Sequence, residues 1–182
     1  MANLTKALLA ETLMDMLRGK SLDKITVQDI TDRCGLNRNT FYYHFDNVHD
    51  VIEWVFTLSA DQILDKCIKT GDLETALDEA AKVLYEHRES IFNIMNSVER
   101  KNIEDFIYDY LDEKLKMIIL KMADNPNPDE EAVREVAILC KYSIAGSILK
   151  WIDDGMPEIS DASVGNLCGI FMKVINRVLS GA

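Results

Sequence analysis

Apolar residues recur every three or four positions along most of the chain, and this spacing predicts amphipathic helices. No segment alternates apolar and polar residues for long enough to predict a strand. We therefore expect an all-α fold of about nine helices. The predicted helices cover about residues 4–19, 26–33, 37–43, 48–68, 73–87, 89–97, 100–123, 129–152 and 161–179.

Residues that favour helix ends separate these segments. Thr26 and Asn37 stand where N-cap residues are needed, and Gly35 between them suits the positive φ that ends many helices. Asp46 or Asn47 can cap the helix that follows. These short-range signals predict where the helices near the N-terminus begin and end.

Residues 25–45 read as two short helices joined by a tight turn with a glycine, which is the helix-turn-helix pattern. In such motifs the start of the second helix meets base edges in the major groove, where Arg can pair with guanine and Asn with adenine. The polar residues there are Asn37, Arg38, Asn39 and Thr40. Aromatic and imidazole groups that can donate to phosphates follow at Tyr42, Tyr43 and His44.

Spacing alone leaves other roles open for part of this segment. Tyr42 and Tyr43 could belong to the core, as we expect for Phe41, and His44 could cap its helix rather than contact phosphate. A metal site is not expected among the nearby His and Asp residues, because histidines five positions apart do not share a helix face. Those residues are His44, Asp46, His49 and Asp50.

The segment resembles the helix-turn-helix of the TetR family of bacterial transcriptional regulators, over about residues 4–60. The resemblance is carried by Ile25-Thr26-Val27, Cys34-Gly35-Leu36, Thr40-Phe41-Tyr42-Tyr43-His44-Phe45 and Asp50-Val51-Ile52. It implies DNA contacts by Thr26, Arg38, Asn39, Thr40, Tyr42, Tyr43 and His44. Family members often place a Lys near the start of the next helix, where this chain has Asn47 and Val48. We therefore expect Asn47 or a backbone amide to contact phosphate there.

The C-terminal part carries a less specific resemblance. The run from Tyr142 to Trp151, followed by Asp154-Gly155-Met156, is similar to regulators of the same family found in Firmicutes, some of which activate dihydroxyacetone kinase operons. This similarity and the helix-turn-helix imply a DNA-binding domain at residues 1–47 and a larger ligand-sensing and dimerisation domain at 48–182.

The net charge of −11 is unusual for a DNA-binding protein and is unevenly distributed. Residues 1–50 carry six Lys and Arg against seven acidic residues, so most of the negative charge lies after them. Charge near the groove matters most, because salt screens interactions beyond about 8–10 Å. We expect modest non-specific DNA affinity and a dependence on paired half-sites.

The last predicted helix has apolar residues over too wide an arc for packing within one chain alone, although a purely intrachain core is the alternative. Small residues in the preceding helix would allow close helix approach. A four-helix bundle between two copies would use both helices. The predicted interface residues are Ala145, Gly146, Leu149, Leu167, Phe171, Val174, Ile175 and Val178.

A ligand pocket among the middle helices is implied by the family resemblance, and no charged cluster identifies the ligand. Aromatic and Met residues at helical spacing are also typical of a plain core. The candidate lining residues are Trp54, Phe92, Met95, Tyr108, Met117, Tyr142 and Trp151.

These observations predict a dimeric regulator that binds a double-stranded DNA operator and responds to a small-molecule effector or a coactivator protein. An interaction module without a small ligand is the alternative. The sequence shows no catalytic motif, cofactor motif, metal spacing, secretory signal or membrane-spanning run. Four scattered cysteines fit buried, reduced thiols, with a redox role as the weaker alternative. We therefore expect a cytoplasmic protein that is not an enzyme and carries no cofactor.

Overall fold

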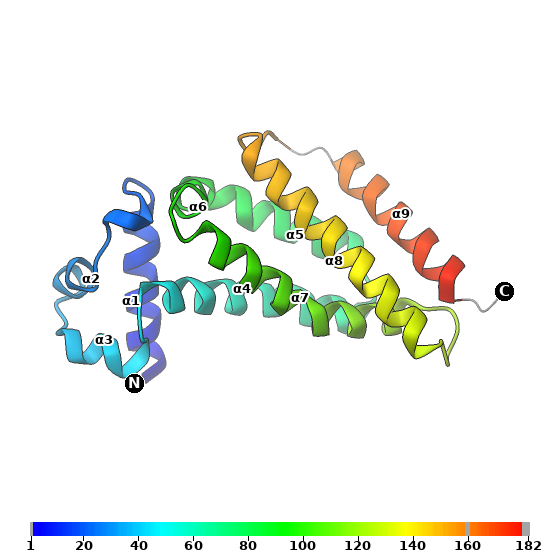
Figure 1. Cartoon of the computed structure of the whole chain (residues 1–182), viewed down its shortest axis with the longest axis horizontal. Coiled ribbons are helices and arrows are strands. Elements are labelled where there is room, and N and C mark those ends of the chain that lie inside the picture. Colours follow the sequence, from blue (N-terminus) through cyan, green and yellow to red (C-terminus); the bar gives the residue numbers. More distant parts are fainter. Residues whose placement is uncertain (1, 159–160, 180–182) are drawn as a thin grey trace. The chain divides into compact units, whose positions relative to one another are not determined.

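A computed structural model describes residues 2–158 and 161–179, which form nine α-helices, one short 3-10 helix and no strand (Figure 1). This confirms the predicted all-α fold, and each predicted helix end lies within about two residues of the observed one. The helices are α1 (Ala2–Leu17), η1 (Leu22–Lys24), α2 (Val27–Cys34), α3 (Arg38–His44), α4 (Val48–Thr70), α5 (Leu73–Glu86), α6 (Arg88–Met95), α7 (Arg100–Met122), α8 (Glu130–Asp153) and α9 (Asp161–Leu179).

The chain divides into two compact units, each of which is built from two separate stretches of the sequence. The first unit contains the residues up to Ser59 together with His87–Phe106, and the second contains Ala60–Glu86 together with the residues from Ile107 onward. Helix α6 and the beginning of α7 therefore belong to the same unit as the three N-terminal helices. The functional division at residue 47 stays a prediction.

The first unit is organised around α1, which packs against α2, α3 and α6. Its core contains side chains with no exposed surface, among them Leu13, Leu17, Ile30 and Phe41. Burial of each such side chain contributes about 1.5–3 kcal/mol relative to leaving it in water. This packing fixes α2 and α3 on the surface of α1.

Local hydrogen bonds begin and end the short helices where the sequence predicts them. Thr26 and Asp29 form a capping box at the start of α2, and Asn37 accepts from the Thr40 N–H at the start of α3. Gly35 between the two helices has φ of 66°. Such a left-handed conformation favours glycine, because in any other residue the Cβ would come too close to the following carbonyl oxygen of the local backbone.

The second unit is a helical bundle in which α9 packs against both α5 and α8. Its shared core draws apolar side chains from α4, α5, α7, α8 and α9. Ion pairs connect its helices. Lys114 on α7 bridges Asp61 and Asp65 on α4, both at 2.8 Å, Lys141 on α8 contacts Asp112 on α7 at 2.6 Å, and Lys66 on α4 pairs with Glu79 on α5.

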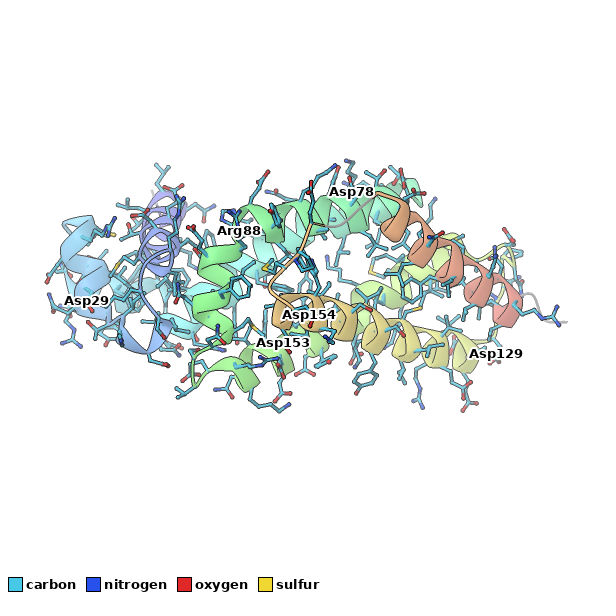
Figure 2. The ribbon with its side chains drawn as sticks, turned by 90° about the horizontal axis from the view of Figure 1, so that it is seen from above. Asp29, Asp78, Arg88, Asp129, Asp153 and Asp154 are labelled. Carbon is cyan, nitrogen blue, oxygen red and sulfur yellow. The ribbon has the colours of Figure 1, made fainter. Side chains whose placement is uncertain are left out.

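Helix α8 has well-defined ends. The Asp129 side chain accepts from the Ala132 N–H at 2.9 Å, and Asp153 and Asp154 lie at the other end (Figure 2). In the last turn of α8, Trp151 Nε1 donates to the carbonyl oxygen of Pro157, which lies beyond the helix, at 2.7 Å. Within the described residues, no helix combines the length and apolarity that crossing a bilayer requires.

The four cysteines are free thiols, as expected for a reduced protein. Cys67, Cys140 and Cys168 are buried, and burial raises the pKa of Cys67 and of Cys140 to about 11. Cys34 at the end of α2 is half-buried, with its Sγ 3.1 Å from Thr12 Oγ1. The buried thiols are therefore poor nucleophiles at neutral pH.

Candidate DNA-binding surface

The first turn of α3 presents its polar side chains to solvent. Arg38 and Asn39 are exposed, and Thr40 is half-buried. Asn37 is exposed as well, but its Oδ1 accepts from the backbone N–H of Thr40 at 2.8 Å and from its hydroxyl at 3.1 Å. Asn37 therefore acts as the cap of the helix. The side chains in this turn that are best placed to contact bases are those of Arg38 and Asn39.

Arg38 is held along the helix by Tyr42. Its Nη2 lies 3.4 Å from the Tyr42 hydroxyl, and the guanidinium carbon lies 5.9 Å from the centre of the Tyr42 ring. The Tyr42 ring in turn meets the buried Phe41 ring edge-on, with centroids 5.6 Å apart. The sequence analysis predicted separate DNA contacts for Arg38 and Tyr42, whereas in the structure the two side chains contact each other. Their spacing of four positions, which places them on one helix face, could have indicated this contact.

Tyr43 and His44 occupy the second half of α3. Tyr43 is 81% exposed, which removes the possibility that it belongs to the core. Its ring lies edge-on to the half-buried His44 ring at 4.9 Å. Both side chains remain candidates for phosphate contacts, since phenol and imidazole groups donate hydrogen bonds.

Thr26 is exposed, but its polar atoms are engaged in the capping box. Its Oγ1 donates to Asp29 Oδ2 at 2.8 Å and accepts from the Asp29 N–H at 3.2 Å. The Thr26 backbone N–H and then its hydroxyl stabilise the charged Asp29 carboxylate and lower its pKa. Asp29 lies at the first turn of α2, as Figure 2 shows.

Asn47 begins α4 through a reciprocal pair of hydrogen bonds. Its Oδ1 accepts from the Asp50 N–H at 3.0 Å, and its Nδ2 donates to Asp50 Oδ1 at 2.9 Å. The other Asp50 oxygen accepts from the Asp46 N–H at 2.9 Å. Of the two predicted caps, Asn47 is the one whose side chain caps α4.

The same turn brings His49 and Asp50, which the sequence analysis considered together with His44 and Asp46, next to Glu53, which it did not consider. Ligand atoms of His49, Asp50 and Glu53 lie within 4.8 Å of one another. His49 Nδ1 is 3.1 Å from Glu53 Oε1, and both Asp50 oxygens already accept hydrogen bonds. Helix capping and this His–Glu contact account for the arrangement.

The charge of this unit is largely neutralised in pairs. Arg33 pairs with Asp15, Lys20 lies 3.7 Å from Asp29, and Arg18 lies 3.5 Å from Glu89. Lys6 instead lies over two aromatic rings, 5.0 Å from the Phe45 centroid and 5.8 Å from that of Trp54. Because this contact depends on tertiary packing between residues far apart in the sequence, it could not be predicted from the sequence.

The predicted ligand-lining residues are divided between the two units. Trp54, Phe92 and Met95 lie in the first, and Tyr108, Met117, Tyr142 and Trp151 lie in the second. Trp54 lines an open depression of about 390 Å³ together with Lys6 and Tyr42–Asp46. Met95 is buried, whereas Met117 is 51% exposed.

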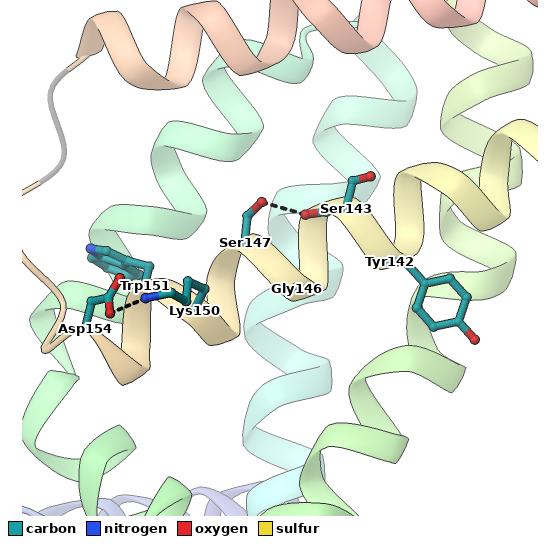
Figure 3. A pocket seen from close by; sticks show the side chains of 7 residues that line it. All are labelled: Tyr142, Ser143, Gly146, Ser147, Lys150, Trp151 and Asp154. Carbon is teal, nitrogen blue, oxygen red and sulfur yellow. Dashed lines mark hydrogen bonds and ion pairs between the residues drawn. The ribbon is translucent and has the colours of Figure 1, made fainter.

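Tyr142 and Trp151 line an open depression of about 530 Å³ on α8 (Figure 3). Gly146, Ser143 and Ser147 form its middle, and the Ser147 hydroxyl donates to the carbonyl oxygen of Ser143 at 2.6 Å. The Tyr108 ring packs against Tyr142 with centroids 5.2 Å apart. The depression follows one helix surface and is wide open to solvent, so it is shaped more like a helix-packing groove than an enclosed cavity.

The predicted interface residues fall into two groups. Ala145, Phe171 and Ile175 are at most 5% exposed and pack inside the core of their own chain. The remainder keep exposed surface, and they are Gly146, Leu149, Leu167, Val174 and Val178. Two large apolar side chains that the predicted interface omitted, Leu139 at 53% and Ile170 at 58%, are also exposed on α8 and α9.

Comparisons with known proteins match both parts of the chain. Residues 10–53 match the family described as bacterial regulatory proteins, tetR family, and residues 71–173 match that described as transcriptional regulator C-terminal region. A transcriptional activator of the dhaKLM operon from Lactococcus lactis subsp. lactis (strain IL1403), DhaS, is 22% identical over 143 residues, which are 78% of this chain and 74% of the relative.

A solved structure described as dihydroxyacetone kinase operon activator DhaS has a similar fold. It superposes with a TM-score of 0.74 at 17% identity, covering 94% of this chain and 96% of that one. At this identity the likeness concerns the fold, and it extends over both compact units.

Proposed function

We propose, from the premise that this chain belongs to the TetR family and is a transcriptional regulator, that it binds a double-stranded DNA operator as a homodimer. The observation that carries the proposal is the start of α3, where a capped helix presents Arg38 and Asn39 to solvent. Such a helix start is the part of a helix-turn-helix that meets base edges. The proposal places the protein in the cytoplasm with its DNA and assigns it no catalytic activity.

The proposed roles follow the geometry of each side chain. Arg38 and Asn39 read bases, Thr40 offers its methyl group to a thymine, and Tyr42 positions Arg38. Tyr43 and His44 donate to phosphates. Thr26, Asn37 and Asn47 contribute mainly as caps, which leaves the backbone N–H groups of the helix starts directed toward phosphates.

The homodimer is proposed to form through the exposed apolar residues of α8 and α9. On α9, Leu167, Ile170, Val174 and Val178 are spaced three or four positions apart and so share one helix face. On α8, Gly146 lies in an open groove where a Cβ would meet no atom within 4 Å. A helix from a second copy fits such a groove, and a twofold dimer presents two recognition helices to successive major grooves.

The signal that controls DNA binding is proposed to act on residues 48–182, as a small-molecule effector or as a coactivator protein. Whichever it is, it must bind one arrangement of the dimer more tightly than another, because only differential affinity shifts an equilibrium. The relative from Lactococcus lactis is an activator of the dhaKLM operon, which makes promoter regions of dihydroxyacetone kinase genes the first DNA to test.

The experiment uses the full-length protein to select duplexes from a random library, and it measures binding of the protein to those promoter fragments in parallel. We expect recovery of a site with twofold symmetry, which we call the operator duplex below. Recovery of no enriched sequence at about 0.15 M salt, together with no promoter binding, would contradict the proposal.

A further inference from the structure

Lys6, on the first helix of the N-terminal unit, places its ammonium group on aromatic rings. Its Nζ is 5.0 Å from the centre of the Phe45 ring and 5.8 Å from that of the Trp54 ring. Other cations of this unit lie against acids, as Arg33 does against Asp15. The face of an aromatic ring attracts a cation without cancelling its charge. Lys6 therefore keeps a positive charge that a further anion can use.

The acidic residues nearest to Lys6 have other surroundings. Lys6 shares an open depression with Asp46, Asp50 and Glu53. Both carboxylate oxygens of Asp50 accept hydrogen bonds at the start of α4, and Glu53 Oε1 lies 3.1 Å from His49 Nδ1. Asp46 is exposed, so water solvates its carboxylate. Among the residues that the structure describes, the contacts of Lys6 are thus the two ring contacts.

The depression places Lys6 beside residues to which we assign DNA contacts. It has a volume of about 390 Å³, and the end of α3 and the first half of α4 line it. The exposed Tyr43 and the half-buried His44, both assigned to phosphates, belong to the same lining. In Figure 1 the N-terminal end of α1 accordingly meets the end of α3, where Lys6 lies over Phe45. The ammonium group therefore stands next to the donors that face the DNA backbone in the proposed complex.

The rings also restrict the Lys6 side chain before DNA binds. A lysine has many rotamers, and ordering them on a phosphate costs conformational entropy. Contact with Phe45 and Trp54 limits these rotamers in advance, as contact with Tyr42 does for Arg38. A lysine on a phosphate acts as a point charge, so it supplies affinity without reading sequence. The role that fits Lys6 is an anchor for the DNA backbone beside the groove that α3 enters.

We propose that Lys6 binds a phosphate of the operator backbone, next to the contacts of Tyr43 and His44, and so adds α1 to the DNA-binding surface. The proposal rests on the proposed function, because it assumes that α3 binds the operator. In a dimer the two copies of Lys6 neutralise two phosphates, so binding releases about two counterions more than it would without them. A residue that only packs against Phe45 and Trp54 would leave the number of released counterions unchanged.

The test measures the affinity of the full-length protein for the operator duplex between about 0.1 and 0.5 M salt. Lys6→Met keeps an unbranched side chain on the rings and removes the charge. We expect the slope of log affinity against log salt to become shallower by about 1.8. This change corresponds to a loss of about thirtyfold at about 0.15 M salt that narrows to a few-fold at about 0.5 M. Lys6→Arg keeps the charge and should follow the wild-type line.

Two further variants separate a phosphate contact from other effects of the substitution. Lys6→Gln should show the same shallow slope, and it serves if Lys6→Met does not fold. Lys101→Met is the matched control, because it removes the same charge from the same unit, where Lys101 pairs with Asp105 on α7. It should keep the wild-type slope.

The outcomes are distinct. A line for Lys6→Met that runs parallel to the wild-type line, at whatever affinity, would overturn the inference and assign Lys6 to packing alone. An equally shallow line for Lys101→Met would also overturn it, because the slope would then follow the net charge of the protein. Failure of the wild type to select any duplex would instead overturn the proposed function.

Discussion

The guanidinium of Arg38 lies over the ring of Tyr42, 5.9 Å from its centroid, one helical turn further along α3. The Tyr42 ring is itself held edge-on against the buried Phe41. These contacts limit the conformations of the flexible Arg38 side chain, to which we assign base reading, before DNA binds. Less conformational entropy is then lost on binding, which favours both affinity and selectivity.

Replacing Arg38 with Ala should relax base preference at one position of each operator half-site by about 1–3 kcal/mol per half-site, because each copy loses one bidentate contact. The measurement is the affinity for a panel of operator duplexes, each altered at one position. Arg33→Ala is the matched control, since Arg33 pairs with Asp15 on α1 and should not change the preference at any position. A uniform loss over the whole panel for Arg38→Ala would contradict the base-reading role.

Replacing Tyr43 with Phe should weaken binding to every duplex of that panel alike, by about 0.5–1.5 kcal/mol, because a phosphate contact carries no sequence information. Tyr43 is 81% exposed, so the substitution leaves the core unchanged. Tyr85→Phe, on α5, is the control and should leave affinity unaltered. Loss at some duplexes and not at others would assign Tyr43 to base recognition instead.

Replacing Gly35 with Ala should destabilise the protein by about 1–2 kcal/mol, because a Cβ is unfavourable at a left-handed residue. The surroundings do not contribute, since apart from Gly35 itself and its two neighbours in sequence no atom lies within 4 Å of where its Cβ would be. Urea unfolding measures the effect. Gly19→Ala shares the open surroundings without the positive φ and should have little effect. Equal stabilities of the two variants would show that the turn does not require its conformation.

Protonation of Asp61 should weaken the fold in acid. Its hydrogen bonds from Lys114 and then from Tyr110 lower the pKa of the carboxyl below its ordinary value of 3.8. The ionised form therefore stabilises the folded state above about pH 4, and this contribution is lost as the pH falls through the lowered folded pKa. Asp61→Asn should be less stable than the wild type at pH 7 and should lose less stability between about pH 5 and pH 2.

Urea midpoints measured across that pH range check the prediction for Asp61. Asp124→Asn, in the exposed loop before α8, is the control and should follow the wild-type curve. Parallel curves for the wild type and Asp61→Asn would show that the contact with Lys114 and Tyr110 does not contribute to stability.

Placing a charge on the apolar face of α9 should dissociate the proposed dimer. Val178→Glu and Ile170→Glu alter side chains that are 47% and 58% exposed in the single chain, so the folded protomer should tolerate both. Sedimentation velocity should show a shift from two copies to one, because a buried charge without a partner is unfavourable. Met117→Glu, at an equally exposed position on α7, is the control and should stay dimeric. Unchanged mass for both α9 variants would place the interface elsewhere.

The helix bounds and the capping residues could be predicted because they depend on neighbours within four positions. Thr26, Gly35 and Asn37 all act through such contacts, and the structure has each where the sequence placed it. The all-α fold follows from the same local periodicity.

Long-range packing could not be predicted in the same way. Nothing near Ser90 or Asn93 in the sequence indicates that α6 joins the N-terminal helices, because the α1 carbonyl groups to which their side chains donate lie 76 positions away. The wide apolar arc of α9 likewise mixes residues such as Ile175, which is 1% exposed, with residues such as Ile170, which faces solvent. Periodicity shows that a face is apolar and does not show which neighbour covers it.

The most direct test of the central claim is the affinity of the full-length protein for the operator duplex, relative to a scrambled duplex of equal length and composition, at about 0.15 M salt. The account predicts a ratio of at least about a thousandfold, with two protein chains bound per duplex and most of the ratio lost in Arg38→Ala. Equal affinity for the two duplexes would contradict it, since the nearly neutral helix-turn-helix would then bind DNA without reading its sequence.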